Sequence, residues 1–374
     1  MPKLFTKAST LFIILILLAL LVFIFLAQKE DNLLKAEVLT ADNSDVMNSG
    51  ISSIGFQHLE VKLIEGKFKN QKFSASNNLT GRPSVDNFFE SGDTILVSLN
   101  IQSGKVVNVI AVDKYRQNWE LLLFLIFIVL LLIYAKEIGL QAIFSFLTSL
   151  LIIWKVLVAG LLANTNPILL ALLVLILLAA FILFSIAGLT KKGLAAFIGT
   201  ITGLFISVTI AMLFGSKMSL FGMTAPYAET LIFSGNLELN MQEIFYVAII
   251  IGASGAAMDI AMDVAASMTE IHNKRPELKF VELMQSGFTV GRDVIGTMTT
   301  TLLLAYSGSY LPLLMLFVSK QTAISRILNY KVIAAEILRT ITGSIGLVLT
   351  APLTALIAAF LLTKEQRLIK NKQK

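Results

Sequence analysis

The sequence predicts an α-helical polytopic membrane protein of about eight transmembrane helices, with a small extracytoplasmic β-barrel-like domain between the first two. Of the 374 residues, 56% are hydrophobic and only 14% are charged, whereas about a quarter of the residues of a soluble domain are charged. Apolar runs of about 18 residues recur along the chain, and each can cross a bilayer core of about 30 Å. A polar segment with period-2 strand patterns interrupts these runs near the N-terminus.

The composition argues against several classes of function. The chain has no cysteine, which excludes disulfides, thiolate chemistry and cysteine-based metal sites. Its two histidines, His58 and His272, are too few for a histidine-rich metal centre. Gly291-Arg292-Asp293 is not a phosphate loop, because no strand precedes it and no lysine completes the motif. We therefore expect no catalytic residue, metal or cofactor. The net charge of +6 indicates basic cytoplasmic loops rather than nucleic-acid binding.

Residues 1–30 are expected to form a cytoplasmic tip and a membrane anchor. The apolar run Leu11–Ala27 follows Lys3 and Lys7, a start that a cleavable signal peptide would share. The residues that follow the run match a small-x-small cleavage site poorly. We therefore favour a retained helix with its N-terminus in the cytoplasm.

Residues 31–116 form a polar segment in which strand patterns alternate with turn residues. Gly66, Asn77-Asn78 and Gly92 provide the turn chemistry. Strands are expected within 34–39, 59–63, 72–75, 94–98 and 106–112. Short strands at this spacing are typical of a small, partly closed β-barrel, so we expect an OB-like domain.

Residues 117–363 are expected to form a multi-helix transmembrane domain, and residues 364–374 a basic cytoplasmic tail. Helices are predicted at about 119–135, 139–162, 167–188, 192–214, 241–268, 288–306 and 345–362. Together with the anchor they make eight spans, which places both termini on one side of the membrane.

The distribution of basic residues predicts the orientation. Lys136, Lys191, Lys192, Lys274 and the basic tail all fall on the side of the termini, whereas the opposite loops carry little positive charge. The positive-inside rule then places both termini in the cytoplasm and residues 31–116 outside it. We expect the protein to lie in the plasma (inner) membrane.

One segment, residues 307–339, does not fit this map. The apolar run Leu311–Val318 is too short to span a bilayer. Lys320, Arg326 and Lys331 would lie outside, against the charge rule. A re-entrant or surface-lying element is the expected solution. The last helix is then expected to begin as early as Lys331.

Ionisable residues within the apolar helices are the main functional candidates. Asp259 and Asp263 are four residues apart and share one helix face. Gly252 and Gly255 precede them and let another helix approach closely. A charge at the bilayer centre costs at least about 2.5 to 3.5 kcal/mol, so such carboxylates usually have a partner or a function.

Two further helices add charged and small residues. Counted from the shared cytoplasmic turn, Arg292 and Asp293 reach about the depth of Asp263, which makes an Asp263–Arg292 pair geometrically reasonable. Glu336 and Arg339 are spaced for a pair within one helix. We expect these charges to line a polar path through the inner half of the bundle. The small and hydroxyl residues expected to pack or line that path are Gly252, Gly255, Gly291, Gly296, Thr297, Thr300 and Gly343.

The same charges have two simpler explanations. A buried ion pair can fix helices in register without any transport, and Asp263 and Asp293 can also lie exposed at the membrane interface. The four acids Asp259, Asp263, Asp293 and Glu336 outnumber the two bases Arg292 and Arg339. Up to two acids are then left without a fixed partner, as proton or cation coupling requires.

These residues also carry a family resemblance. The run Gly252–Asp263, the motifs Gly291-Arg292-Asp293 and Gly296-Thr297-Met298, and Glu336-Ile337-Leu338-Arg339 resemble the signature of the YibE/F-like bacterial membrane proteins. The passage Gly66–Gln71 in the polar segment is similar as well, so the resemblance covers essentially the whole chain. It implies a bacterial plasma-membrane protein but no particular activity.

A more distant resemblance concerns the order of the parts. An anchor, an outer domain, a helix with paired acids, a cytoplasmic hairpin and a threonine-rich helix look like one half of an RND exporter or a Sec translocase accessory subunit. Those families couple proton flow through intramembrane acids to movement of an outer domain, which would assign the coupling positions to Asp259 and Asp263. The chain departs from them in its much smaller outer domain and its two additional helices.

Three hypotheses about function follow. The first is a transporter or transport-accessory protein driven by proton or cation movement through Asp259, Asp263, Arg292 and Asp293. The second is a non-enzymatic scaffold whose outer domain binds a partner or an envelope component. The third, an intramembrane enzyme, has least support because no nucleophile–base pair is present. The expected partners are the lipid bilayer and a second copy or a related membrane protein, since the small-residue faces around Gly252 and Gly343 suit helix association.

Overall fold

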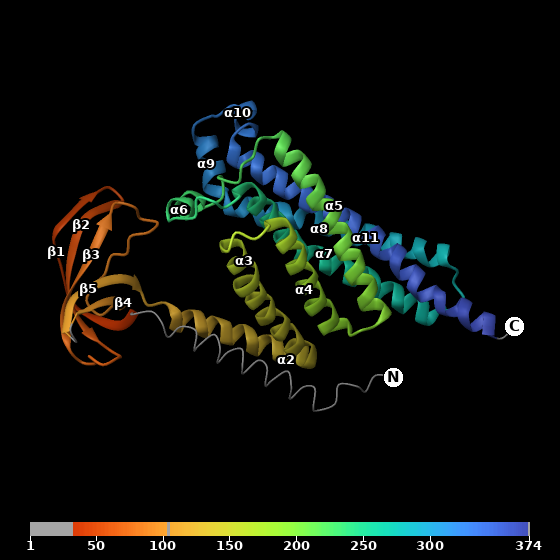
Figure 1. The fold of residues 1–374 in the computed structure, drawn as a ribbon, viewed down its shortest axis with the longest axis horizontal. Coiled ribbons are helices and arrows are strands. Elements are labelled where there is room, and N and C mark those ends of the chain that lie inside the picture. The colour runs from red at the N-terminus through yellow and green to blue at the C-terminus, as the bar shows by residue number, and fades with distance from the viewer. Residues whose placement is uncertain (1–32, 103–104, 373–374) are drawn as a thin grey trace. The chain divides into compact units, whose positions relative to one another are not determined.

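A computed structural model describes residues 33–102 and 105–372, with side chains up to residue 363 (Figure 1). The predicted anchor helix lies outside the described residues. By its internal contacts the chain divides into two compact units, Met1–Lys136 and Glu137–Lys374.

The first unit contains a closed five-stranded barrel. Its strands pair in the order β1-β2-β3-β5-β4, and β1 also pairs with β4 to complete the closure. All neighbours are antiparallel except β3 and β5, which run parallel. The prediction of a small β-barrel is therefore confirmed, and each predicted strand lies within an observed one. The strands are β1 (Leu33–Ser49), β2 (Ser52–Leu63), β3 (Lys72–Thr80), β4 (Thr94–Gln102) and β5 (Lys105–Lys114).

Alternation along the strands builds the barrel core. Leu59, Val61 and Leu63 on β2 point inward and are almost fully buried, whereas the residues between them remain partly exposed. Phe89, from the loop between β3 and β4, has no exposed surface and also belongs to this core. Burial of this apolar surface is the main source of the barrel's stability.

A buried amide network attaches the β3–β4 loop to the barrel. Gln57 Nε2 donates to Asn43 Oδ1 at 2.8 Å and to the Phe89 carbonyl at 3.1 Å. Gln57 Oε1 accepts from Asn77 Nδ2 at 2.8 Å and from the Phe89 amide at 3.1 Å. Every donor and acceptor site of this fully buried side chain is therefore used, as burial of a polar group requires.

Asp86 organises the start of the same loop. Its carboxylate accepts hydrogen bonds from the Thr80 amide at 2.9 Å, the Thr80 hydroxyl at 2.8 Å and the Arg82 amide at 2.8 Å. Loss of hydration raises the pKa of Asp86, but these hydrogen bonds outweigh it and lower the pKa below the ordinary value of 3.8. The ionised form therefore stabilises the folded loop.

The second unit consists of helices, and its first helix begins in the first unit. α2 runs from Gln117 to Leu151 but is broken at Lys136, whose φ of 50° and ψ of −118° are not helical. This break separates the two helices predicted at 119–135 and 139–162. The remaining helical segments are η2 (Ile152–Val158), α3 (Ala159–Leu162), α4 (Pro167–Ala187), α5 (Lys191–Lys217), α6 (Ala228–Phe233), α7 (Met241–Lys274), α8 (Phe280–Ser309), α9 (Leu311–Ser319), α10 (Ile324–Leu328) and α11 (Lys331–Lys372).

Polar caps define where the long helices begin. Asn166, Thr190 and Asn240 precede α4, α5 and α7, and each side-chain oxygen accepts a backbone N–H of the first turn. These caps lie in the turns that the sequence predicted between spans. They satisfy helix termini that otherwise have no intrahelical partner.

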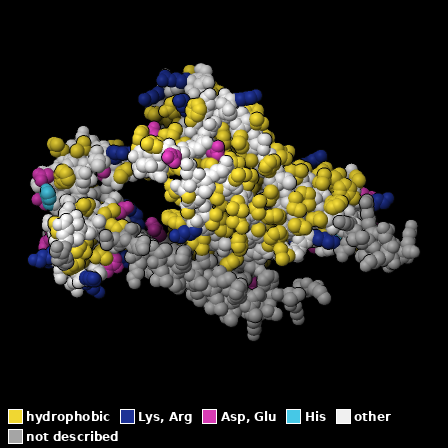
Figure 2. All heavy atoms as spheres, viewed as in Figure 1, with side chains coloured by type: hydrophobic (Ala, Val, Ile, Leu, Met, Phe, Trp, Pro, Cys, Tyr) yellow, Lys and Arg dark blue, Asp and Glu magenta, His cyan; other side chains and the backbone are white. Residues whose placement is uncertain are grey.

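Several helices are long and apolar enough to cross a membrane. Among the described residues five helical runs qualify, and the bent pair α8–α9 would make a sixth. The first of the five, Gln117–Leu162, contains the break at Lys136. On the face shown in Figure 2, hydrophobic side chains cover most of the surface of the second unit. A membrane protein is therefore supported, while the count of eight spans remains a prediction.

Residues 307–339, which did not fit the predicted pattern of spans, contain the short helices α9 and α10. α8 ends at Ser309, and α9 continues from it at an angle of 69°. A short α10 follows before α11 begins at Lys331, the earliest start expected for the last helix. α11 is thus longer than the span predicted at 345–362. Its additional first turns carry Glu336 and Arg339.

Glycine and threonine bring α5 and α11 into very close contact. A Cβ built on Gly199 would lie 2.0 Å from Thr354 Oγ1, and one on Gly203 would lie 2.1 Å from Thr350 Oγ1. One turn further along α5, Ser207 Oγ donates to the Thr342 carbonyl at 2.7 Å. The glycines therefore let two backbones meet at a distance that no other residue allows.

α7 is the central helix of the bundle and contacts α4, α5, α8 and α11 (Figure 1). Ala253, Ala257, Ala261 and Ala265 recur every four residues and are almost completely buried. Small side chains at this spacing form one face of a helix and allow neighbours to pack closely.

The close contact of α5 and α11 predicts that a larger residue at Gly203 destabilises the bundle. Gly203→Ala is expected to destabilise the bundle by about 1–3 kcal/mol, because the added methyl overlaps Thr350. The matched control is Gly308→Ala, since nothing lies within 4 Å of the Cβ position at Gly308, near the end of α8. Thermal unfolding in detergent measures both. Equal unfolding temperatures for the two variants would contradict this packing.

The hydrogen bonds of Asp86 predict a dependence of barrel stability on pH. Because its pKa is lowered in the folded state, its contribution is complete above the unfolded value of 3.8 and is lost as the pH falls through the folded value. Thermal unfolding of a 33–114 fragment should therefore shift to lower temperature below about pH 4. Asp86→Asn should unfold more easily at neutral pH and show a weaker acid shift. Glu90→Gln, at an exposed side chain, should keep the full acid shift.

Candidate functional site

α7 places the two predicted acids on a narrow uncovered stripe. Gly252, Gly255, Asp259 and Asp263 are all exposed, although their neighbours along the helix are largely buried. They recur every three or four residues and so lie on one face. Asp259 lies near the middle of this 34-residue helix. No described residue forms an ion pair with either carboxylate.

α8 carries Arg292 and Asp293 at the depth of Asp263. The antiparallel packing of α7 and α8 sets this depth, since Gly287 lies against Met268 and Gly291 lies near Val264. Arg292 lines a pocket of about 200 Å³ together with Val348, Ala351 and Pro352 of α11. Arg292 therefore lies on the flank of α8 next to α11, whereas Asp263 lies on α7.

The expected Asp263–Arg292 ion pair is not formed within the described chain. The predicted depth is confirmed by the packing of the hairpin, but depth alone does not determine which flank a residue occupies. Gly291 packs against Ala351 of α11, and the next residue, Arg292, is turned about 100° further round the helix. This rotation directs Arg292 away from α7.

Hydroxyl groups extend the polar face of α8. Thr297 donates to the Val294 carbonyl at 3.0 Å, and Thr300 donates to the Thr297 carbonyl at 3.3 Å. Both side chains and Gly296 are exposed. Their hydroxyl protons are satisfied within the helix, and their oxygen lone pairs remain as acceptors.

Glu336 and Arg339 form the ion pair expected from their spacing. Arg339 Nη1 lies 3.0 Å from Glu336 Oε1, and the two side chains are only 17% and 12% exposed. The guanidinium also lies 5.6 Å from the centre of the Phe245 ring and 5.7 Å from that of Tyr306, within the range of a cation–π interaction. The charges of this pair are therefore compensated within α11 and held by aromatic rings of α7 and α8.

The sequence analysis missed the aromatic residues around this pair. Tyr306, Tyr310 and Glu336 line a pocket of about 300 Å³ whose other residues are mainly apolar. Tyr306 also reaches the end of the α7 stripe, since a Cβ on the exposed Gly252 would lie 2.5 Å from the tyrosine hydroxyl. Tyr306 lies in the last turn of α8 and Tyr310 is its C-cap, so the close spacing of these tyrosines in the sequence was the available signal.

The six predicted charges lie in two groups at different levels along the helices. Glu336 and Arg339 lie at the level of Tyr306 and Gly252. Gly252 and Asp263 are 11 residues apart, which corresponds to about 16 Å along a helix. Glu336 and Arg339 therefore lie about three helical turns from Asp263, and a path lined by all six charges stays a prediction. Asp259, Asp263, Arg292 and Asp293 remain as a group at similar depths.

Gly291 and Gly343 have packing roles. A Cβ on Gly291 would lie 3.1 Å from that of Ala351, and one on Gly343 would lie 3.0 Å from Leu302. Gly291 of α8 and Gly343 of α11 therefore both lie where these two helices pack against each other. By contrast, nothing lies within 4 Å of the Cβ positions at Gly255 and Gly296.

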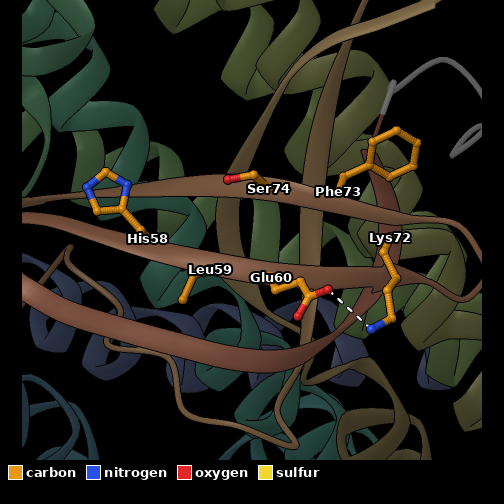
Figure 3. A pocket seen from close by; sticks show the side chains of 6 residues that line it. All are labelled: His58, Leu59, Glu60, Lys72, Phe73 and Ser74. Atoms are coloured by element: carbon orange, nitrogen blue, oxygen red, sulfur yellow. Dashed lines mark hydrogen bonds and ion pairs between the residues drawn. The ribbon is translucent and has the colours of Figure 1, made fainter.

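The barrel carries a separate shallow hollow of about 370 Å³ on β2 and β3 (Figure 3). Glu60 and Lys72 form an ion pair of 3.2 Å at one end of it, and His58 lies at the other. His58 Nε2 is 3.0 Å from Asp45 Oδ2, and both side chains are more than half exposed. These are surface pairs of small energetic value, and nothing about them indicates catalysis.

Fold and charges together define a class: a multi-pass membrane protein with a small β-barrel domain and ionisable groups within its apolar helices. Family models identify it further. The model of the YibE/F-like protein matches residues 123–364, and that of the YibE/F family N-terminal domain matches residues 33–112. The chain belongs to the YibE/F-like family, as the resemblance indicated. A comparison with curated proteins gave no match, and a comparison with solved structures gave none either.

The buried ion pair on α11 predicts that replacing one of its two residues destabilises the protein more than replacing both. Arg339→Met should destabilise the protein by about 3–5 kcal/mol, because it leaves the largely buried Glu336 carboxylate without its counter-charge. The double variant Glu336→Met with Arg339→Met should recover most of this loss, since neither charge then remains. Thermal unfolding in detergent provides the comparison. A double variant less stable than the single one would rule out this account of the pair.

Proposed function

We propose that this protein is a transporter or transport-accessory protein in which proton or cation movement is coupled through Asp259 and Asp263. The observation that carries the proposal is the position of these carboxylates. They lie in the central part of an apolar helix of membrane-spanning length, and no base within the described residues pairs with them. An uncompensated carboxylate in hydrocarbon is costly, so a proton, a cation or a partner must supply the missing charge.

The balance of charge at this depth supports coupling. Asp259, Asp263 and Asp293 face a single base, Arg292, because Glu336 and Arg339 already neutralise each other. Complete neutralisation by fixed bases is therefore impossible in one copy of the chain. Exchange of a proton or cation at the remaining acids is the simplest way to change the charge of α7 reversibly.

The surroundings of the acids are suited to a change of state. Gly252 and Gly255 lie on the same stripe as the two carboxylates. Acceptor oxygens of Thr297 and Thr300 lie on the neighbouring helix at similar depths. A helix that packs more closely on this stripe when the two carboxylates are neutralised than when they are charged would link ion binding to movement.

The orientation belongs to the same proposal. Basic residues at the α4–α5 and α7–α8 turns, such as Lys191, Lys192 and Lys274, favour a cytoplasmic location for those turns. In that orientation residues 31–116 face the outside of the plasma membrane, where the barrel would take part in the movement that ion flow drives.

A flux measurement tests the proposal. Protein reconstituted in liposomes should collapse an imposed proton or sodium gradient, and Asp259→Asn with Asp263→Asn should reduce the flux by at least about tenfold, as loss of an essential coupling group does. The matched control is Glu270→Gln on the same helix, since Glu270 is exposed and pairs with Lys274 at 3.2 Å. Unchanged flux in the double variant would reject coupling through these acids.

A scaffold is the second candidate, and one feature of the barrel favours it. The β1–β2 hairpin ends in Gly50 and Ile51, and the side chains of Met47, Ile51 and Phe56 are strongly exposed. Exposed apolar side chains of this kind mark binding surfaces. If the protein is a scaffold, binding of an envelope component should persist in Asp259→Asn with Asp263→Asn and be lost in Ile51→Asp.

A further inference from the structure

Two glycines well inside helices of the bundle, Gly255 on α7 and Gly296 on α8, face open space, as does Gly308 at the end of α8. Gly199, Gly203 and Gly343 each lie against a neighbouring helix, whereas nothing lies within 4 Å of the Cβ positions at Gly255 on α7 and Gly296 on α8. Glycine within a helix is less favourable than alanine by about 0.5–1 kcal/mol. No contact within the described chain explains glycine at Gly255 and Gly296, but the close approach of a helix from outside does.

The outer face of α8 has the composition of a helix interface. Thr289, Asp293, Gly296 and Thr300 recur every three or four residues, and all are exposed. They therefore form one face of the helix. Small and hydroxyl residues on one face favour close packing of membrane helices, and contact with lipid gives them no partner.

Charges flank this face in a complementary arrangement. Arg292 lies on the flank next to α11, where it lines the pocket with Pro352. Asp263 lies on α7, beyond the opposite flank, at the same depth. A two-fold axis along the membrane normal preserves depth and brings opposite flanks of facing helices together. Such an axis in front of α8 directs Arg292 of each copy toward the α7 stripe of the other.

We propose that the outer face of α8 and the uncovered stripe of α7 bind a second copy of this chain, so that Arg292 of each copy pairs with Asp263 of the other. The acid group is then completed only in the dimer. This inference does not rest on transport, since a scaffold would need the same neutralisation. In the dimer Asp259 and Asp293 remain without a fixed base, which leaves carboxylates available for coupling.

The other apolar segments of the chain are poorer occupants of this surface. The run Leu11–Ala27 contains no charged residue, and the run 119–135 contains one, Glu120. Neither segment brings a base to the depth of Asp263. A second copy supplies the base at the required depth, because it carries the same Arg292.

A charge exchange between two copies tests the pairing. One tagged variant carries Asp263→Arg and a second, with a different tag, carries Arg292→Asp. Either variant alone places like charges opposite each other, so its self-association should fall by at least about tenfold, the effect of 1.4 kcal/mol. Co-expressed, the two variants place opposite charges at both contacts and should co-purify with each other at the level of the wild-type chain.

This outcome separates the dimer from a pair within one chain. An intramolecular pair would be broken in both variants, and mixing them would restore nothing. Failure of the mixture to co-purify, with both variants monodisperse in detergent, would overturn the proposal. Flux is not measured, so failure of the transport proposal cannot be mistaken for failure of the dimer.

Cross-linking provides a second test that needs no charged substitution. The chain has no cysteine, so each variant contains a single thiol. Gly296→Cys and Thr300→Cys should form disulfide-linked dimers in membranes treated with a mild oxidant. Ile176→Cys, at an exposed position near the middle of α4, should form far fewer. Equal cross-linking at all three positions, or monomers at each, would contradict the proposed face.

Discussion

The close approach of α5 and α11 is the constraint on which the rest of the helical bundle depends. Gly199 and Gly203 have no side chain to separate the two backbones, so Thr354 and Thr350 lie directly against α5. Lipid tails are as apolar as leucine, and burial of apolar surface therefore contributes little to helix association in a membrane. Packing of small residues provides the attraction instead.

The position of α11 then determines where the functional candidates lie. Ala351 and Ala355 of α11 meet Gly291 and Gly287 of α8. This contact fixes the rotation of α8 about its own axis, and that rotation carries Arg292 away from α7. The charge arrangement near the acids is thus a consequence of small-residue packing on the far side of α8, not of attraction between the charges.

Local patterns were sufficient for much of the fold. Alternation predicted the barrel strands, apolar runs predicted the long helices, and the three-residue spacing of Glu336 and Arg339 predicted their ion pair. Depth along a helix was also predictable, because it follows from counting residues from a turn. Each of these depends on residues close together in the sequence.

Properties that depend on distant residues were not predictable in the same way. The flank that Arg292 occupies is set by Ala351, 59 positions later in the chain, so the Asp263–Arg292 pair was expected but is absent from the described residues. The buried network of Gln57 requires Asn77 and the Phe89 backbone, which only barrel closure brings together. An isolated glutamine in a strand pattern gives no sign of such a role.

The length of α11 has a mechanical consequence. Its 42 residues correspond to about 63 Å, roughly twice the thickness of a hydrocarbon core. Pro352 lies at its midpoint and removes one backbone hydrogen bond there. A swing of 10° about that point would displace each end by about 5 Å for arms of this length. A small rearrangement beside Arg292 would therefore become a displacement of several ångströms at each end of α11.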